Sequence, residues 1–325
     1  MSTAISLRNP AIDMVRFIAM IMVVSLHTTH THYNNLDLSW LLYNLSLPAV
    51  PLFFLCSGYL LLGRPRSRCN LRYVAGKIAS CVKVVAVMAI AAVLALQLFS
   101  PVEIIRTIWR SVVQTGPVDH LWFLWALCIV YLPLPLINRL YNSRMRIFNA
   151  LTLLLIVIQA VIFVLNITSQ FELYLPQTFR IWNWLSYFML GGILHRYDFR
   201  LSKPFPTVCV TAAAMLASMY LIYPVMDINF CEYFYCSPVV VIFVCCLFVA
   251  CINTRASGRY NFPALASLFL PVYLIHPYVI YALDHTFGRL YWQIPLLTFI
   301  STLSLSVIIA LAITKVKPLK ALLSV

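Results

Sequence analysis

Long apolar segments separated by short polar connections dominate the pattern of this chain. Ten such segments occur, each close to the ~20 residues that an α-helix needs to cross the hydrocarbon core of a bilayer. The connections are too short for an inserted soluble domain, and no internal repeat divides the chain. We therefore predict an all-α polytopic membrane helical bundle of about ten transmembrane helices, in a single membrane-embedded domain over residues 1–325. The predicted spans are 11–30, 41–62, 74–99, 119–140, 149–168, 181–195, 206–224, 237–254, 263–283 and 292–314.

The composition agrees with this pattern. The chain is 62% hydrophobic and only 10% charged, which is far from the composition of a soluble globular protein. Its formal net charge of +14 does not indicate a nucleic-acid partner, because the basic residues lie in short connections rather than on one face. The first apolar segment is long and has no small-residue cleavage site after it, so we expect it to be a retained span rather than a signal peptide.

The distribution of Lys and Arg predicts the orientation of the bundle. With the N-terminus in the cytoplasm, 17 of the 23 basic residues fall in inner segments. The outer connections then hold only Arg106, Arg110, Arg180 and Arg289. By the positive-inside rule, we expect both termini to be cytoplasmic and membrane lipids to surround the bundle.

Two ionisable residues share one face of the first predicted span. Arg16 and His27 are eleven positions apart, so at about 100° per residue their side chains point the same way, about 16 Å apart along the axis. In the predicted orientation Arg16 lies near the cytoplasmic edge and His27 near the outer edge. Ionisable residues inside a membrane usually face a cavity or the bundle interior. The alternative is that the Arg16 side chain only reaches out to the membrane–water interface, and that His27 is only a packing residue between helices.

Two further histidines are predicted at the depth of His27. His120 begins the fourth span at its outer edge, and His276 lies in the outer third of the ninth. The sequence alone does not bring the three side chains together. His30 and His32 add spacings that can chelate a metal, but no Cys or carboxylate at a fixed spacing completes a ligand set, so we expect no metal.

Basic residues of a different character lie on the inner side. Arg72 and Lys77 belong to a basic cluster between the second and third spans, and the positive-inside rule explains most of that cluster. It does not explain Lys83, which lies deeper, like Arg16. A cavity lined by these two would suit a phosphorylated ligand from the cytosol. At the inner end of the second span, Ser57-Gly58 permits close approach of a neighbouring helix or of a ligand.

Cys231 and Cys236 both fall in a predicted outer connection. In an oxidising compartment they could form a disulfide. The alternative is two free thiols.

These residues and motifs resemble the acyltransferase-3 family of integral membrane acyltransferases over nearly the whole chain. The hallmark of the family is an Arg, ten residues and then a His in the first span. Further matches are "PLFFLCSGYLL", "HLWFLWALCIVYLPLPLI", "YFMLGGILHR" and "VYLIHPYVI", in the order of the family. Many relatives have Arg-x-x-Arg at the start of the third span, whereas no two arginines here are three positions apart. A role for Arg72 or Lys77 in binding a phosphate therefore rests on their basic character alone.

The resemblance implies transfer of an acyl group, most simply acetyl, from cytosolic acetyl-CoA. The acceptor would be a hydroxyl of a surface polysaccharide or of its lipid-linked precursor, at the bacterial inner membrane. The single-domain form is most similar to the O-acetyltransferases of O-antigen in lipopolysaccharide and of enterobacterial common antigen. A transporter or flippase for an anionic or lipid-linked substrate is the alternative, and a structural scaffold is a third.

The resemblance also implies roles for individual residues. Arg16 would hold a phosphate of the coenzyme, at a distance from His27 of the order of an extended pantetheine arm. His27 would act as general base toward a sugar hydroxyl, or would carry the acyl group covalently. His276 or His120 would orient His27 or polarise the carbonyl oxygen. The further candidates for coenzyme binding are Arg72, Lys77, Lys83 and Ser57.

Overall fold

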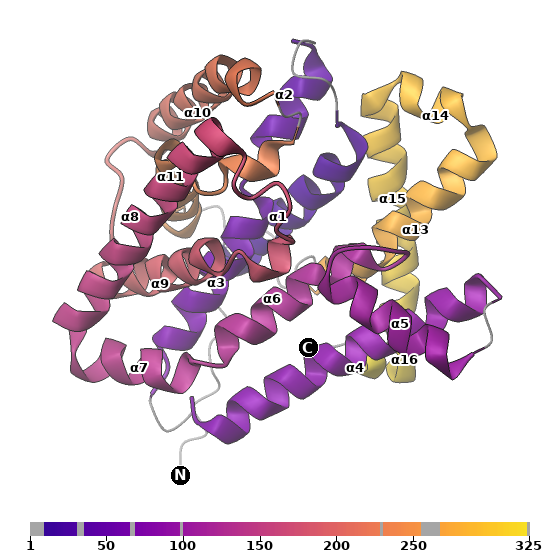
Figure 1. Ribbon diagram of the computed structural model, residues 1–325, viewed down its shortest axis with the longest axis horizontal. Helices are drawn as coiled ribbons and strands as arrows, with labels where there is room; N and C mark the ends of the chain where they lie inside the picture. Colours follow the sequence, from indigo (N-terminus) through magenta and orange to yellow (C-terminus); the bar gives the residue numbers. More distant parts are fainter. Residues whose placement is uncertain are drawn as a thin grey trace.

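The computed structural model describes residues 10–30, 36–65, 69–97, 100–227, 230–254 and 267–323, and this part of the chain contains helices and turns but no strand (Figure 1). The all-α prediction is therefore confirmed. The helices are α1 (Pro10–Thr28), α2 (Leu38–Leu45), α3 (Ala49–Leu62), α4 (Leu71–Ala95), α5 (Pro101–Val112), α6 (Trp122–Tyr131), α7 (Leu134–Ser143), α8 (Met145–Ser169), α9 (Ile181–Tyr197), α10 (Pro204–Met226), α11 (Pro238–Ile252), α13 (Phe269–Phe287), α14 (Arg289–Gln293), α15 (Pro295–Lys315) and α16 (Lys317–Leu322). Short 3-10 turns occupy Asp119–Leu121, Gln177–Phe179 and Cys231–Phe234.

Among the described residues, six helical segments are long and apolar enough to cross a membrane, and the pair α6 and α7, bent by 53°, would make seven. The other three predicted spans correspond to α9, α11 and α13. α9 has 17 residues and α11 has 15, which at 1.5 Å per residue is shorter than the ~30 Å hydrocarbon core. α13 is long enough but is interrupted by polar residues. The start of the ninth predicted span, 263–266, lies outside the described residues.

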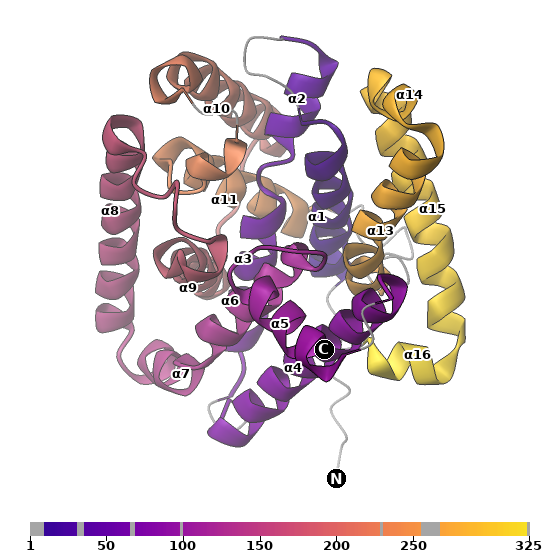
Figure 2. The same cartoon turned by 45° about the vertical axis from the view of Figure 1, so that its right-hand side comes forward.

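α1 lies near the centre of the bundle, where it packs against α3, α11, α13 and α15 (Figures 1 and 2). This position places the face that carries Arg16 and His27 among other helices.

The pair α3 and α9 forms the closest helix packing, and glycines make it possible. A Cβ atom at Gly58 would lie 1.7 Å from the carbonyl oxygen of Phe188, and one at Gly191 would lie 2.1 Å from that of Leu55. Of the two alternatives for Ser57-Gly58, the structure therefore has a neighbouring helix at Gly58. This packing fixes the position of α9 relative to α3.

The outer helices present apolar side chains away from the bundle. α8 and α15 lie on opposite sides of the molecule (Figure 2), and both expose rows of Leu, Ile and Val. Exposing such apolar surfaces to water would cost free energy, whereas in a bilayer they face the apolar lipid chains.

α5 was not expected as a helix, because its apolar residues are interrupted by charges. Val102, Ile105 and Trp109 recur at helical spacing and are all exposed. The Ser100 hydroxyl caps the helix by accepting a hydrogen bond from the amide of Val102.

Candidate active site

His27 lies in the last turn of α1, next to two threonines whose side chains hydrogen-bond to the backbone of the helix. The hydroxyl of Thr28 donates to the carbonyl of Val24 (2.8 Å), and that of Thr29 donates to the carbonyl of Ser25 (2.7 Å). The threonine hydroxyls therefore add to the backbone ladder at this helix end, where the carbonyl of Ser25 also accepts from the amide of Thr29 (3.0 Å). Both threonines are buried, whereas His27 is exposed to a cavity.

Three histidines from three distant segments meet at this end of α1. The ring centroids of His27 and His276 are 5.0 Å apart, and those of His120 and His276 are 6.2 Å apart. His120 comes from the turn before α6, and His276 comes from the middle of α13. The structure thus brings together three histidines that the sequence placed at one predicted depth.

The two buried histidines have unused hydrogen-bonding capacity. His276 is fully buried, and its Nδ1 lies 3.2 Å from the carbonyl oxygen of Val272. If Nδ1 carries the proton, Nε2 is an unpaired acceptor, and this atom has no partner in the structure. Neither ring nitrogen of His120 has a hydrogen-bond partner, although Nδ1 lies 3.9 Å from a carboxylate oxygen of Asp119. Buried polar atoms without partners are rare, and they suit a site that receives a ligand.

A cavity of about 280 Å³ opens beside His27 and His120. Its size is at the lower end of the range for small-molecule sites. His276 is not among its described lining residues, so it contacts His27 from behind the cavity wall. Aromatic residues make up much of the wall: Tyr43, Phe53, Trp122, Phe123, Phe230, Tyr235, Phe269 and Tyr273.

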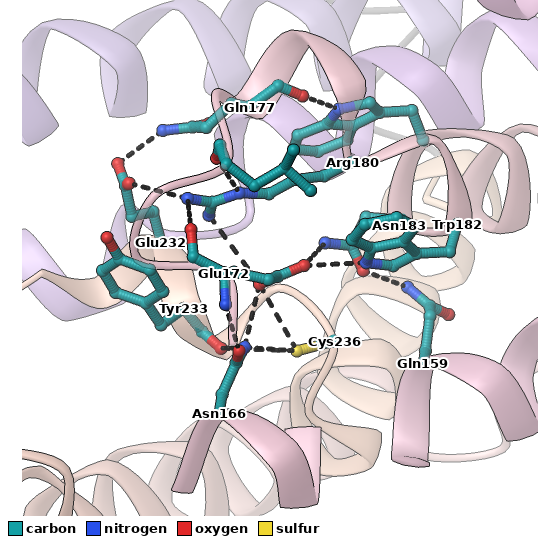
Figure 3. Close-up of polar contacts among 12 residues, drawn as sticks. Gln159, Asn166, Glu172, Gln177, Arg180, Trp182, Asn183, Glu232, Tyr233 and Cys236 are labelled. Atoms are coloured by element: carbon teal, nitrogen blue, oxygen red, sulfur yellow. Dashed lines mark hydrogen bonds and ion pairs between the residues drawn. The ribbon is translucent and has the colours of Figure 1, made fainter. Parts of the chain in front are cut away.

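A buried charged cluster, which we define as Glu172, Arg180 and Glu232, adjoins this cavity (Figure 3). The Arg180 side chain is 2% exposed and reaches both carboxylates, with Nη2 3.5 Å from Oε1 of Glu232 and Nη1 3.8 Å from Oε2 of Glu172. It also donates to the carbonyl oxygens of Leu175 and Glu172, each at 3.0 Å. The guanidinium is therefore held between the two carboxylates.

The two carboxylates of the cluster have different environments. Glu172 is fully buried and accepts hydrogen bonds from the side chains of Asn166 (2.8 Å), Trp182 (2.7 Å) and Asn183 (3.3 Å). Glu232 accepts one from the Gln177 side-chain amide and also lines the cavity. Burial raises the pKa of the Glu232 carboxyl above its ordinary value, and the Arg180 guanidinium opposes that change.

This cluster was not predicted as part of a site from the sequence, in which Arg180 is only one of four outer basic residues. A signal was present, because six of the nine acidic residues of the chain, Glu172 and Glu232 among them, fall in predicted connections on the same side as His27. Charged residues beside apolar spans need partners, but the sequence does not show which connections meet.

At the other end of α1, Arg16 has an acidic neighbour that the sequence analysis did not use. Nη1 of Arg16 lies 3.9 Å from Oδ1 of Asp13, whose side chain is 2% exposed. The Arg16 side chain itself is 34% exposed, so its guanidinium can still accept another anionic partner.

The other predicted coenzyme-binding residues are not all grouped with Arg16. Lys77 is half-buried and within electrostatic range of Arg16, while Ser57 is half-buried on α3 and Arg72 is exposed on α4. Lys83 donates to the carbonyl oxygen of Ala321 in α16 at 2.7 Å. A cavity lined by Arg16 and Lys83 stays a prediction, and Lys77 is a further basic residue near Arg16.

Cys231 and Cys236 are both buried free thiols in the structure. Cys236 Sγ accepts a hydrogen bond from the side chain of Asn166 (3.4 Å), next to Glu172. Of the two alternatives for this pair, the structure therefore has the free thiols. Within the described ranges, no group of three or more His, Cys, Asp and Glu is arranged to hold a metal ion.

The comparisons with known proteins agree with the resemblance in the sequence. The profile of the acyltransferase 3 family, described as an acyltransferase domain, matches residues 9–315. No curated protein and no solved structure matches the chain. Because the family match covers most of its length, the chain belongs to the acyltransferase 3 family and is a membrane acyltransferase, as its sequence predicts.

Proposed function

We propose that this acyltransferase takes an acetyl group from cytosolic acetyl-CoA and transfers it to a hydroxyl of a surface polysaccharide or its lipid-linked precursor, of the kind found in O-antigen or enterobacterial common antigen. Ten helices cross the bacterial inner membrane, with both termini in the cytoplasm. In this arrangement α9 and α11 are short spans, and α13 is a span of ordinary length that carries polar residues. The excess of Lys and Arg in the inner connections supports the orientation.

One observation carries the proposal: His27, His120 and His276 meet beside a cavity at one end of α1. Arg16 lies on the same helix, eleven residues earlier. An acyl donor bound near Arg16 thus has a path of about 16 Å along α1 to His27. The donor and the acceptor then approach His27 from opposite sides of the membrane.

In the direct mechanism, His27 acts as general base. An imidazole nitrogen removes the proton from the acceptor hydroxyl as the hydroxyl oxygen attacks the thioester carbonyl. The tetrahedral intermediate collapses, the C–S bond breaks, and the imidazolium returns its proton to the coenzyme thiolate. The products are an ester on the glycan and free coenzyme on the cytoplasmic side.

In the covalent mechanism, the imidazole nitrogen itself attacks the thioester carbonyl, the C–S bond breaks, and the coenzyme leaves as its thiolate, which takes up the proton that the imidazole loses. The acceptor hydroxyl oxygen then attacks the acyl group on His27, the C–N bond breaks, and the hydroxyl proton passes to the released imidazole. In either mechanism His276 is a positioning residue, because it contacts the ring of His27 from outside the cavity. His120 lines the cavity and has free ring nitrogens, so it is suited to polarise the carbonyl oxygen.

On the cytoplasmic side, Arg16 and Lys77 hold phosphate groups of the coenzyme. Arg provides a planar fork that binds two phosphate oxygens, and Lys adds a point charge. Lys83 and Arg72 would act only at the periphery of such a site, since Lys83 is bonded to α16 and Arg72 is exposed. Ser57, on the neighbouring helix α3, is a further candidate.

The test is transfer of a labelled acetyl group by the purified protein in liposomes. Acetyl-CoA with a labelled acetyl group is supplied, and the acceptor is surface glycan from cells that lack this gene. We expect label in the glycan and a mass increase of one acetyl group per acylated sugar. Hydrolysis of acetyl-CoA without label in the glycan would contradict the proposal.

A further inference from the structure

The cavity beside His27 has a second polar wall, which the proposed mechanism does not use. Gln114, Gln177 and Glu232 line it together with His27 and His120. The backbone amide of Gln177 donates to Oε1 of Gln114 (3.0 Å), and its side-chain amide donates to Glu232. These residues come from the connections after α5, α8 and α10, so three separate segments build one wall.

The Glu232 carboxylate is fixed in place yet accessible. One of its oxygens accepts from Gln177, and the other lies 3.5 Å from the Arg180 guanidinium. Its side chain is 27% exposed, compared with 2% for Arg180 and 0% for Glu172. Of the charged cluster, only Glu232 therefore presents a hydrogen-bond acceptor to a molecule in the cavity.

The charges around the cavity disfavour an anion. No Lys or Arg is among the described lining residues. Arg180 lies behind Glu232 and is shared by two carboxylates, so the cluster carries a net charge of −1 when all three groups are ionised. A carboxylate or phosphate on the ligand would meet this negative wall without a cation to pair with.

The remaining surface suits a ring with many hydroxyl groups. Trp122 and Tyr235 contribute aromatic side chains to the same cavity, and a few fixed polar groups in an aromatic cavity orient a small ligand. A hydroxyl that donates to a carboxylate forms a charge-assisted hydrogen bond, which is stronger than a neutral one.

We propose that Glu232 hydrogen-bonds the hydroxyl groups of the acceptor ring, with Arg180 and Gln177 as its positioning residues, and that this subsite selects an uncharged sugar. The inference rests on the proposed function, because it assigns the acceptor side of the same cavity. It adds the class of sugar that receives the acetyl group and the residue that recognises it.

The first experiment compares wild type with Glu232→Gln in the liposome assay, with glycan from cells that lack this gene as acceptor. The KM for this glycan should rise roughly ten- to a hundredfold, the loss expected for one hydrogen bond to a charged group. The KM for acetyl-CoA should stay within about twofold, because Glu232 is far from the cytoplasmic end of α1. Glu103→Gln is the matched control, because the Glu103 carboxylate also pairs with an arginine, Arg106, but is not among the described residues that line the cavity. It should leave both values unchanged.

The second experiment needs no variant, so it remains decisive if Glu232→Gln does not fold. Wild type acetylates the same glycan, and fragmentation mass spectrometry identifies the sugar that carries the new ester. We expect an uncharged sugar. An acetyl group on a uronic acid or on a phosphorylated sugar would overturn the inference, as would a normal KM for the glycan in a folded Glu232→Gln protein. If wild type transfers no acetyl group at all, the proposed function fails and this inference fails with it.

Discussion

Replacing Arg180 with Met would remove the cation of the charged cluster while keeping a side chain of similar length. The structure indicates what is lost: hydrogen bonds to two carbonyl oxygens, each at 3.0 Å, and ion pairs with two carboxylates. Glu172 would stay fully buried with its amide and indole donors but without a counter-charge. Breaking a buried pair in this way typically costs about 3–5 kcal/mol, so we expect a loss of that size in the free energy of unfolding of Arg180→Met.

Thermal unfolding in detergent can measure this loss with a thiol-reactive dye, because most of the described cysteines are buried in the folded protein. For domains of 150–250 residues, each kcal/mol of lost stability lowers Tm by about 2–4 °C, so a loss of about 3–5 kcal/mol should lower Tm by roughly 6–20 °C. Adding Glu172→Gln to Arg180→Met removes the stranded charge and should recover at least about 1 kcal/mol. If Arg180→Met unfolds within about 2 °C of wild type, the cluster does not stabilise the fold and our reasoning about it is wrong.

Three further predictions concern the ligands and the orientation. Arg16→Lys should weaken acetyl-CoA binding roughly ten- to a hundredfold; unchanged affinity would leave Arg16 as a membrane anchor paired with Asp13. Burial raises the pKa of Glu232, so acceptor binding should be complete above that pKa and lost as the pH falls through it. On acidification the KM for the glycan should therefore begin to rise at a pH above 4.5, the ordinary pKa of a Glu carboxyl. If the KM of Glu232→Gln rises in the same way, Glu232 is not the cause. In a cysteine-free background, Glu232→Cys should react with a membrane-impermeant thiol reagent added from outside. Arg66→Cys, at a position outside the described residues, should react only after the membrane is permeabilised. The reverse pattern would overturn the orientation.

The sequence predicted an all-helical chain and one shared face for Arg16 and His27, because both depend on local spacing. Apolar length determines where a span forms, and an eleven-residue separation determines which face Arg16 and His27 share. Both inferences need only one segment at a time.

Lateral neighbours could not be predicted in this way, because they depend on how the helices pack. The close approach of α3 and α9 places Gly58 against the backbone of Phe188 and Gly191 against that of Leu55. Nothing in the sequence of either segment identifies the other as its neighbour. For the same reason the sequence did not bring Arg180 and Glu232 together. The helix α5 was missed because its charged residues interrupt the apolar pattern.

The central claim is that His27 performs the chemistry of acyl transfer, and the activity of His27→Ala tests it most directly. The control is His285→Ala, because His285 is exposed on α13 and stacks on Tyr281. Loss of a catalytic base usually costs ~10²–10⁴ in rate, so kcat for labelled acetyl transfer by His27→Ala should fall by that factor while acetyl-CoA binding and Tm stay near those of wild type. His285→Ala should remain within about threefold of wild type. A His27→Ala protein that transfers acetyl groups within about tenfold of the wild-type rate would contradict the account.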